Sequence, residues 1–126
     1  MKKILIICLM TILPSLGYSA EPTCQTYNEN NYCSYSGKVQ RIYVNASNQI
    51  LIYFDQPLSL EVASTFGYEI TYGGAAIFPI DDKPEFAKMF YSTALTAQAS
   101  GRNISIQMRS VLNGYMKFDR IWLAAP

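Results

Sequence analysis

The stretch from Asp82 to Met108, DKPEFAKMFYSTALTAQASGRNISIQM, decides the fold, because it predicts a helix with almost no polar face, followed directly by a strand. Asp82 is the expected N-cap of this helix, with Pro84 in its first turn and Glu85 three residues after the cap, as in a capping box. Gly101, which follows a serine, marks the expected C-terminal stop. A helix this apolar needs more cover than one sheet face provides.

The polar and small side chains of this helix fall on one narrow stripe, at 100° per residue. The rest of its surface is bulky and apolar. One interpretation is a helix buried deep in its own domain, and the other is a helix with its own sheet on one side and a neighbouring subunit on the other. The stripe consists of Glu85, Lys88, Ser92, Thr96 and Ala99.

Residues 1–20, MKKILIICLMTILPSLGYSA, combine two early lysines, an apolar run and a small-residue end. This pattern predicts a secretory signal peptide, and the run is too short to span a bilayer. We therefore expect an exported protein, first periplasmic and then secreted, without a membrane span.

Cleavage would leave two cysteines, Cys24 and Cys33, which we expect to pair in an oxidising compartment and to tie an N-terminal arm, residues 21–37. A loop this short is worth on the order of 2 to 3 kcal/mol by the chain-entropy estimate. Two thiols and no histidine do not make a metal site, and no cofactor is expected. The lack of histidine also excludes Ser-His-Asp and Cys-His catalysis. Paired carboxylates remain open, but nothing in their placement predicts an enzyme.

The charge balance is nearly neutral, with a formal net charge of +1 for the whole chain, so no basic stripe predicts nucleic-acid binding. Tyrosine is abundant, with 10 in the chain. Tyrosine-rich exported domains bind sugars or proteins, because the ring offers an apolar face and the hydroxyl a hydrogen bond. The alternative is that these tyrosines are ordinary strand residues.

Alternating and β-branched segments predict strands before and after the helix, within one domain at residues 38–126. The order is strand, strand, strand region, helix, strand, strand, which is that of the OB-fold, a five-stranded barrel with its helix between strands 3 and 4. A plain α+β sandwich has the same order and is the alternative. Residues 58–66 stay unassigned. The expected strand segments are residues 38–45, 49–55, 67–71, 75–80, 103–109 and 117–123.

The segment 86–106, FAKMFYSTALTAQASGRNISI, resembles the B subunits of pertussis-like and subtilase-type bacterial toxins. The resemblance implies a secreted OB-fold that assembles into a ring of five. It also implies that the helices line a pore for the tail of a catalytic A subunit, and that the outer surface binds sialylated glycans. In this chain the pore-facing residues would be Lys88, Ser92 and Thr96.

The resemblance also implies a glycan site just before the first strand of the domain. A Tyr-Ser pair grips sialic acid in relatives, and Tyr35-Ser36 stands in the matching place here. Ser34 lies beside the pair, and Tyr43 is a candidate lateral platform. The alternative is that Ser36-Gly37 is an ordinary turn. Relatives often carry a lysine after the second strand, whereas this chain has none between Lys38 and Lys83.

Together these features predict a non-enzymatic, glycan-binding delivery subunit of a secreted toxin. It would act as a homopentamer with an A subunit and sialylated host glycans as partners. The alternative is a periplasmic OB-fold protein that binds or inhibits a protein partner and has no sugar site.

Overall fold

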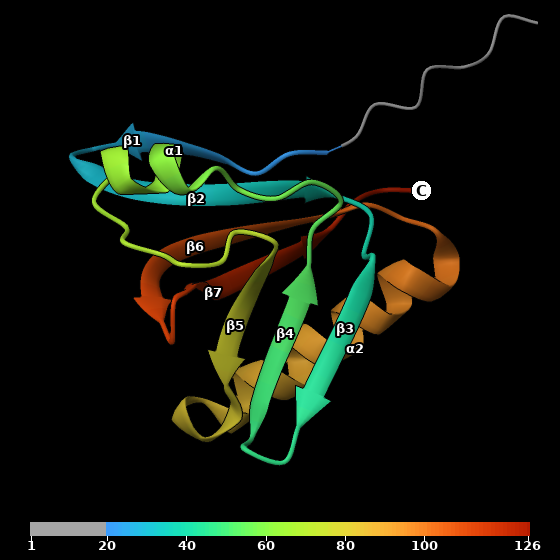
Figure 1. The fold of residues 1–126 in the computed structure, drawn as a ribbon. Helices are drawn as coiled ribbons and strands as arrows, with labels where there is room; N and C mark the ends of the chain where they lie inside the picture. Colours follow the sequence, from blue (N-terminus) through green and yellow to red (C-terminus); the bar gives the residue numbers. More distant parts are fainter. Residues whose placement is uncertain (1–19) are drawn as a thin grey trace, which may run out of the picture.

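The computed structural model describes residues 20–126, so residues 1–19 of the expected leader lie outside the described part of the chain. These described residues form a mainly β protein with one long helix (Figure 1). The elements are β1 (Thr23–Tyr27), β2 (Asn30–Gly37), β3 (Arg41–Asn45), β4 (Gln49–Tyr53), α1 (Leu60–Thr65), β5 (Ala75–Pro79), the 3-10 turn η1 (Ile80–Asp82), α2 (Pro84–Ser100), β6 (Ile104–Leu112) and β7 (Tyr115–Leu123).

All strands belong to one seven-stranded sheet in the order β1-β2-β6-β7-β5-β4-β3. The expectation of five strands is therefore wrong, and the sheet ends in two edge strands, β1 and β3, rather than closing. Its pairs are antiparallel except for β5 and β7, which run parallel. Only residues 38–40 connect β2 to β3, although four other strands lie between them in the sheet. The sheet must therefore bend sharply, and Figure 1 shows β2, β6 and β7 crossing over β5, β4 and β3.

The segment expected as an arm, residues 21–37, is a hairpin of the sheet. Cys24 and Cys33 face each other in the ladder of β1 and β2 and form the predicted disulfide. Cys33 is fully buried, because β2 also pairs with β6 and its inward side chains join the core. The disulfide thus fastens an edge strand to the body of the sheet.

Local turn chemistry accounts for the hairpins on either side of the core. The turn at Asn113-Gly114 has positive φ at both residues, 51° and 81°, as a two-residue hairpin between β6 and β7 requires. Between β3 and β4, Asn48 adopts a φ of 56°. Residues 67–71 are not a strand, and the unassigned segment 58–66 contains α1, whose N-cap is Ser59.

Helix α2 has the predicted end and a different start. Gly101 takes the left-handed conformation with a φ of 66°, and its N–H donates to the Ala97 carbonyl. The expected N-cap, Asp82, is wrong: Lys83 holds that position, without a side-chain cap. Asp82 belongs to η1, where its carboxylate pairs with Lys117 Nζ at 2.9 Å. This ion pair to β7 engages the side chain that the capping box would have used.

One face of α2 packs on the sheet through three alanines and a phenylalanine. The small alanines allow a close approach, and Phe90 stacks on Phe118 of β7 with ring centroids 3.7 Å apart. The opposite side still carries large apolar groups, since Met89 is 69% exposed and Tyr91 and Leu95 are partly exposed. The sheet is therefore the first of the two predicted partners of this helix.

Candidate functional site

The outer face of β2 carries polar side chains opposite the core. Ser34 and Ser36 point outward, while Tyr35 between them is buried. In the ladder with β6, Ser34 lies opposite Gln107 and Ser36 opposite Ser105. The hydroxyls of Ser36 and Ser105 lie 2.7 Å apart. This face therefore offers hydroxyl and amide groups to solvent.

Tyr35 does not belong to this face, because its side chain has no exposed surface. Its hydroxyl donates to the Lys38 carbonyl at 2.6 Å and accepts from the Asp55 N–H at 3.2 Å, and its ring packs 4.9 Å from Phe54. Burial raises the pKa of this phenol. Tyr35 is thus a core residue in this structure, and it has no surface with which to contact a glycan.

Tyr43 is 48% exposed, but it lies on β3, at the other edge of the sheet from β1. Its partner in the ladder is Leu51 of β4. The structure brings Ser34 and Ser36 together on one face and does not bring Tyr43 to them.

A cavity of about 360 Å³ opens at the outer face of β2 and β6, next to the β1–β2 turn. It joins the polar face described above, because Gln107 of its lining stands opposite Ser34 on one side and Arg120 on the other. Its walls combine two aromatic rings, two amides and two guanidinium groups. The lining residues are Tyr27, Asn30, Tyr32, Gln107, Arg109 and Arg120.

An irregular pairing of β6 and β7 shapes the charged side of this cavity. Gln107 pairs with Arg120 and Met108 with Phe118, so that Asp119 has no partner in the register. The next pair joins Ser110 to Lys117, which leaves Arg109 out in the same way. Such bulges redirect side chains and are frequent beside functional sites.

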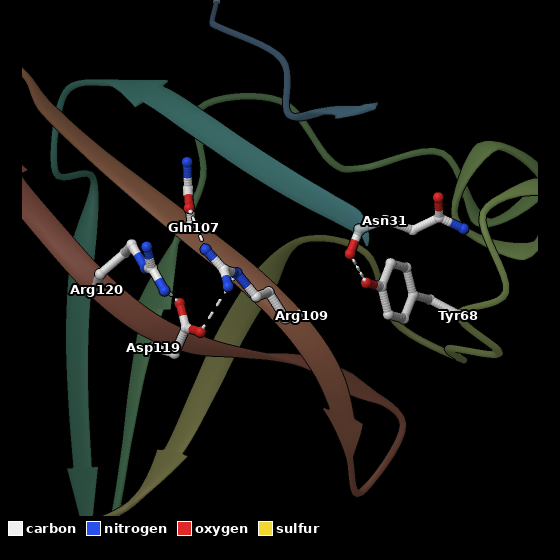
Figure 2. Close-up of polar contacts among 6 residues, drawn as sticks. All are labelled: Asn31, Tyr68, Gln107, Arg109, Asp119 and Arg120. Carbon is white, nitrogen blue, oxygen red and sulfur yellow. Dashed lines mark hydrogen bonds and ion pairs between the residues drawn. The ribbon is translucent and has the colours of Figure 1, made fainter. Parts of the chain in front are cut away.

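The two residues displaced by these bulges contact each other. Asp119 bridges both arginines, with Oδ2 at 3.6 Å from Arg109 Nε and Oδ1 at 3.2 Å from Arg120 Nε. Arg109 also donates to Gln107 Oε1 at 3.2 Å. Figure 2 shows this chain of contacts across β6 and β7. Two guanidinium groups and one carboxylate leave the cluster with a net charge of +1.

Tyr68 fastens the loop after α1 near this cluster. Its hydroxyl donates to the Asn31 carbonyl (Figure 2). The Asn31 amide donates in turn to the Phe66 carbonyl at 3.0 Å. Burial raises the pKa of Tyr68, while the nearby charge of Arg109 lowers it and that of Asp119 raises it. Tyr68 therefore stays protonated at neutral pH and can act as a hydrogen-bond donor.

The residues expected to face a pore, Lys88, Ser92 and Thr96, are all exposed on α2. Lys88 pairs with Glu85 at 3.6 Å, and the Thr96 hydroxyl donates to the Ser92 carbonyl at 2.9 Å. They form a polar strip along the helix, on the side away from the core.

An apolar groove of about 260 Å³ runs between α2 and the β3–β4 hairpin. Val44 at its rim is 48% exposed and Tyr91 is 37% exposed. This groove and the cavity at Arg109 and Arg120 are separate features, with opposite chemistry. The groove is lined by Val44, Ile50, Ile80, Ala87, Lys88 and Tyr91.

Comparisons with family models, with curated proteins and with solved structures find no match. Within residues 20–126, no three or more His, Cys, Asp or Glu side chains gather into a metal-binding group. No helix of that part of the chain is long and apolar enough to cross a membrane.

Proposed function

We propose that this protein is a glycan-binding delivery subunit of a secreted bacterial toxin, which recognises sialylated cell-surface glycans as a ring of five and carries a catalytic A subunit. The observation that carries the proposal is the cavity beside Tyr32, Arg109 and Arg120. Aromatic rings stack on the apolar faces of sugars, and amides bind their hydroxyl groups. Guanidinium groups suit the carboxylate of an acidic sugar.

The proposed glycan site therefore differs from the one expected in the sequence. Ser34 and Ser36 remain in it, as hydroxyl groups on the same sheet face. Tyr32 takes the place of Tyr35, because it is the tyrosine of β2 that lines the cavity. The two arginines supply the positive charge that a lysine after the second strand often supplies in the toxin subunits that this chain resembles. This chain has no lysine between Lys38 and Lys83.

The sheet order supports an OB-fold as the frame of this function. If β2 and β3 are the two halves of one bent first strand, the order β3-β4-β5-β7-β6-β2 is that of a five-stranded barrel with α2 between its third and fourth strands. The parallel pairing of β5 and β7 fits this scheme. β1 would then be an added edge strand.

The exposed apolar surface of α2 and β3 supports assembly into a ring. A cyclic assembly needs two different patches on each copy. The groove between Val44 and Tyr91 is one candidate patch, and the exposed residues Tyr72, in the loop before β5, and Val111, on β6, are candidates for the second. In such a ring, Lys88, Ser92 and Thr96 would face the pore and receive the tail of the A subunit.

The glycan function is tested on an array that carries sialylated glycans and their neutral counterparts. We expect Arg120→Gln to lower binding to sialylated glycans at least tenfold, because it removes a charged donor from the cavity. Arg41→Gln is the matched control, since Arg41 lies on β3 and packs over the ring of Tyr53 instead. Equal binding by wild type and Arg120→Gln would refute the proposed site.

The apolar groove also favours a second candidate function, a periplasmic protein that binds or inhibits a protein partner. Val44 and Tyr91 would then contact that partner rather than another copy. A native mass measurement separates the two candidates. A monomer without glycan binding would favour the second.

A further inference from the structure

We propose that Asp119 sets the charge specificity of the cavity by reducing the advantage that a doubly negative ligand has over a singly negative one. This inference rests on the proposed glycan-binding function and concerns the same cavity. It goes beyond that function because it assigns the choice between singly and doubly charged ligands to a residue outside the cavity lining.

Asp119 lies on β7 within contact of both arginines. It is the residue that β7 displaces from the register with β6, and its two carboxylate oxygens point to the two arginines (Figure 2). Arg109 is displaced from the register on β6 by the same irregularity. A regular pairing of β6 and β7 would not turn both of these side chains out of the ladder.

The ion pairs of Asp119 with Arg109 and Arg120 add little to the stability of the fold. The side chains of Arg109 and Asp119 are 42% and 38% exposed, and ion pairs between exposed groups contribute little. Their main effect is therefore on the charge that a ligand meets. The carboxylate engages Nε of both arginines, which leaves the terminal amino groups of Arg120 as donors for a ligand.

The charges of Arg109, Arg120 and Asp119 together decide what a ligand meets in the cavity. The cavity lining contains no carboxylate, so Asp119 alone reduces the charge of the arginine pair from +2 to +1. One negative charge on a ligand neutralises the cluster. A second negative charge on the ligand is attracted by the arginines but repelled by Asp119, so it adds less affinity than it would beside the arginine pair alone. At a separation of roughly 6 Å in water, one unit charge changes the affinity for another by about threefold.

The test is an NMR titration of the ¹⁵N-labelled protein at pH 8 and low salt. The probes are glucuronic acid, which carries one negative charge, and glucose 6-phosphate, which carries two at this pH. In Asp119→Asn we expect the ratio of the two affinities to move toward glucose 6-phosphate by about threefold or more, and this shift to disappear in 1 M salt, where charges are screened within about 3 Å.

Two variants keep the result tied to the charge of Asp119. Asp119→Glu retains the charge and should keep the wild-type preference. Asp81→Asn removes the same charge from η1, where Asp81 contacts Asn48, and should leave the ratio unchanged. The proposal is overturned if Asp119→Asn keeps the wild-type ratio, if the shift in Asp119→Asn persists in 1 M salt, or if Asp81→Asn shifts the ratio equally.

Sugar-free probes separate this inference from the proposed function. Acetate carries one negative charge and inorganic phosphate carries two at this pH, and neither contains a sugar. Suppose that these anions shift the amide signals of Gln107 and Arg120, that Asp119→Asn changes the ratio of their affinities, and that no sugar binds. The glycan function then fails and the role of Asp119 stands. If sugars bind at the cavity and Asp119→Asn leaves the preference for charge unchanged, only the role of Asp119 fails.

Discussion

Tyr35 of β2 joins the connection before β3 to the segment after β4 through its buried hydroxyl, which contacts the Lys38 carbonyl and the Asp55 N–H. We expect Tyr35→Phe to lower the free energy of unfolding by about 1 to 3 kcal/mol, because both backbone groups lose their partner in a partly buried place. Urea unfolding measures the change. Tyr43→Phe, at an exposed position, should change stability by less than about 0.5 kcal/mol. Loss of glycan binding in a folded Tyr35→Phe protein would contradict the structural role.

The same phenol predicts a loss of stability in alkali. Burial raises the pKa of Tyr35 above 10.0, so the folded state holds this proton more tightly than the unfolded state. The resulting stabilisation is complete below pH 10 and is lost as the pH rises from 10 through the pKa of the folded state. Between pH 9 and 11.5, the urea midpoint of wild type should fall more steeply than that of Tyr35→Phe. Parallel curves would argue against it.

Period-two alternation shows why the expected Tyr35-Ser36 pair fails as a joint site. Neighbouring residues of a strand point to opposite faces, so only one of the two can face a ligand once this segment is a strand. The segment between Cys24 and Cys33, QTYNENNY, is so polar that its sequence pattern does not predict β1 or the start of β2. Tyr32 was missed for that reason. The sequence does not indicate that Arg109 and Arg120 belong to a site, because they come together through bulges that no local pattern predicts.

At the scale of elements, local signals agree with the structure where a position needs a positive φ. Gly101 ends α2 and Asn113-Gly114 turns β6 into β7, because each position needs a positive φ that these residues tolerate. The start of α2 was wrong because Asp82 pairs with Lys117, a contact from a distant part of the chain. Local chemistry therefore predicts the end of α2, whereas a long-range contact decides its start.

The β1–β2 hairpin depends on its disulfide, because β1 is an edge strand with exposed side chains. We expect Cys24→Ser to destabilise the protein by about 2 to 3 kcal/mol, as the chain-entropy estimate gives for a short loop. The urea midpoint of wild type should fall on reduction, while that of Cys24→Ser should not respond to reductant. A midpoint that is the same with and without reductant in wild type would contradict this role.

At the scale of the whole molecule, the unpaired apolar side of α2 predicts self-association. Tyr91→Lys places a charge in the groove that Tyr91 shares with Val44, and we expect it to convert the ring into smaller species, because burying that charge is costly. Native mass spectrometry measures the change, and a thermal melt of the monomer checks that the fold survives. Ala125→Lys, at an exposed place near the C-terminus, should leave the assembly intact. A wild-type monomer would refute the ring.

The parallel pair of β5 and β7 governs when this chain can fold. β7 is the last strand in the sequence, yet it lies between β5 and β6 and joins the two parts of the sheet. Until residues 115–123 are available, the β3–β4–β5 meander and the β1–β2 hairpin with β6 have no strand in common. Such late, distant pairings fold slowly, on the scale of milliseconds to seconds. A nascent chain would therefore keep the two parts of its sheet apart until residues 115–123 emerge.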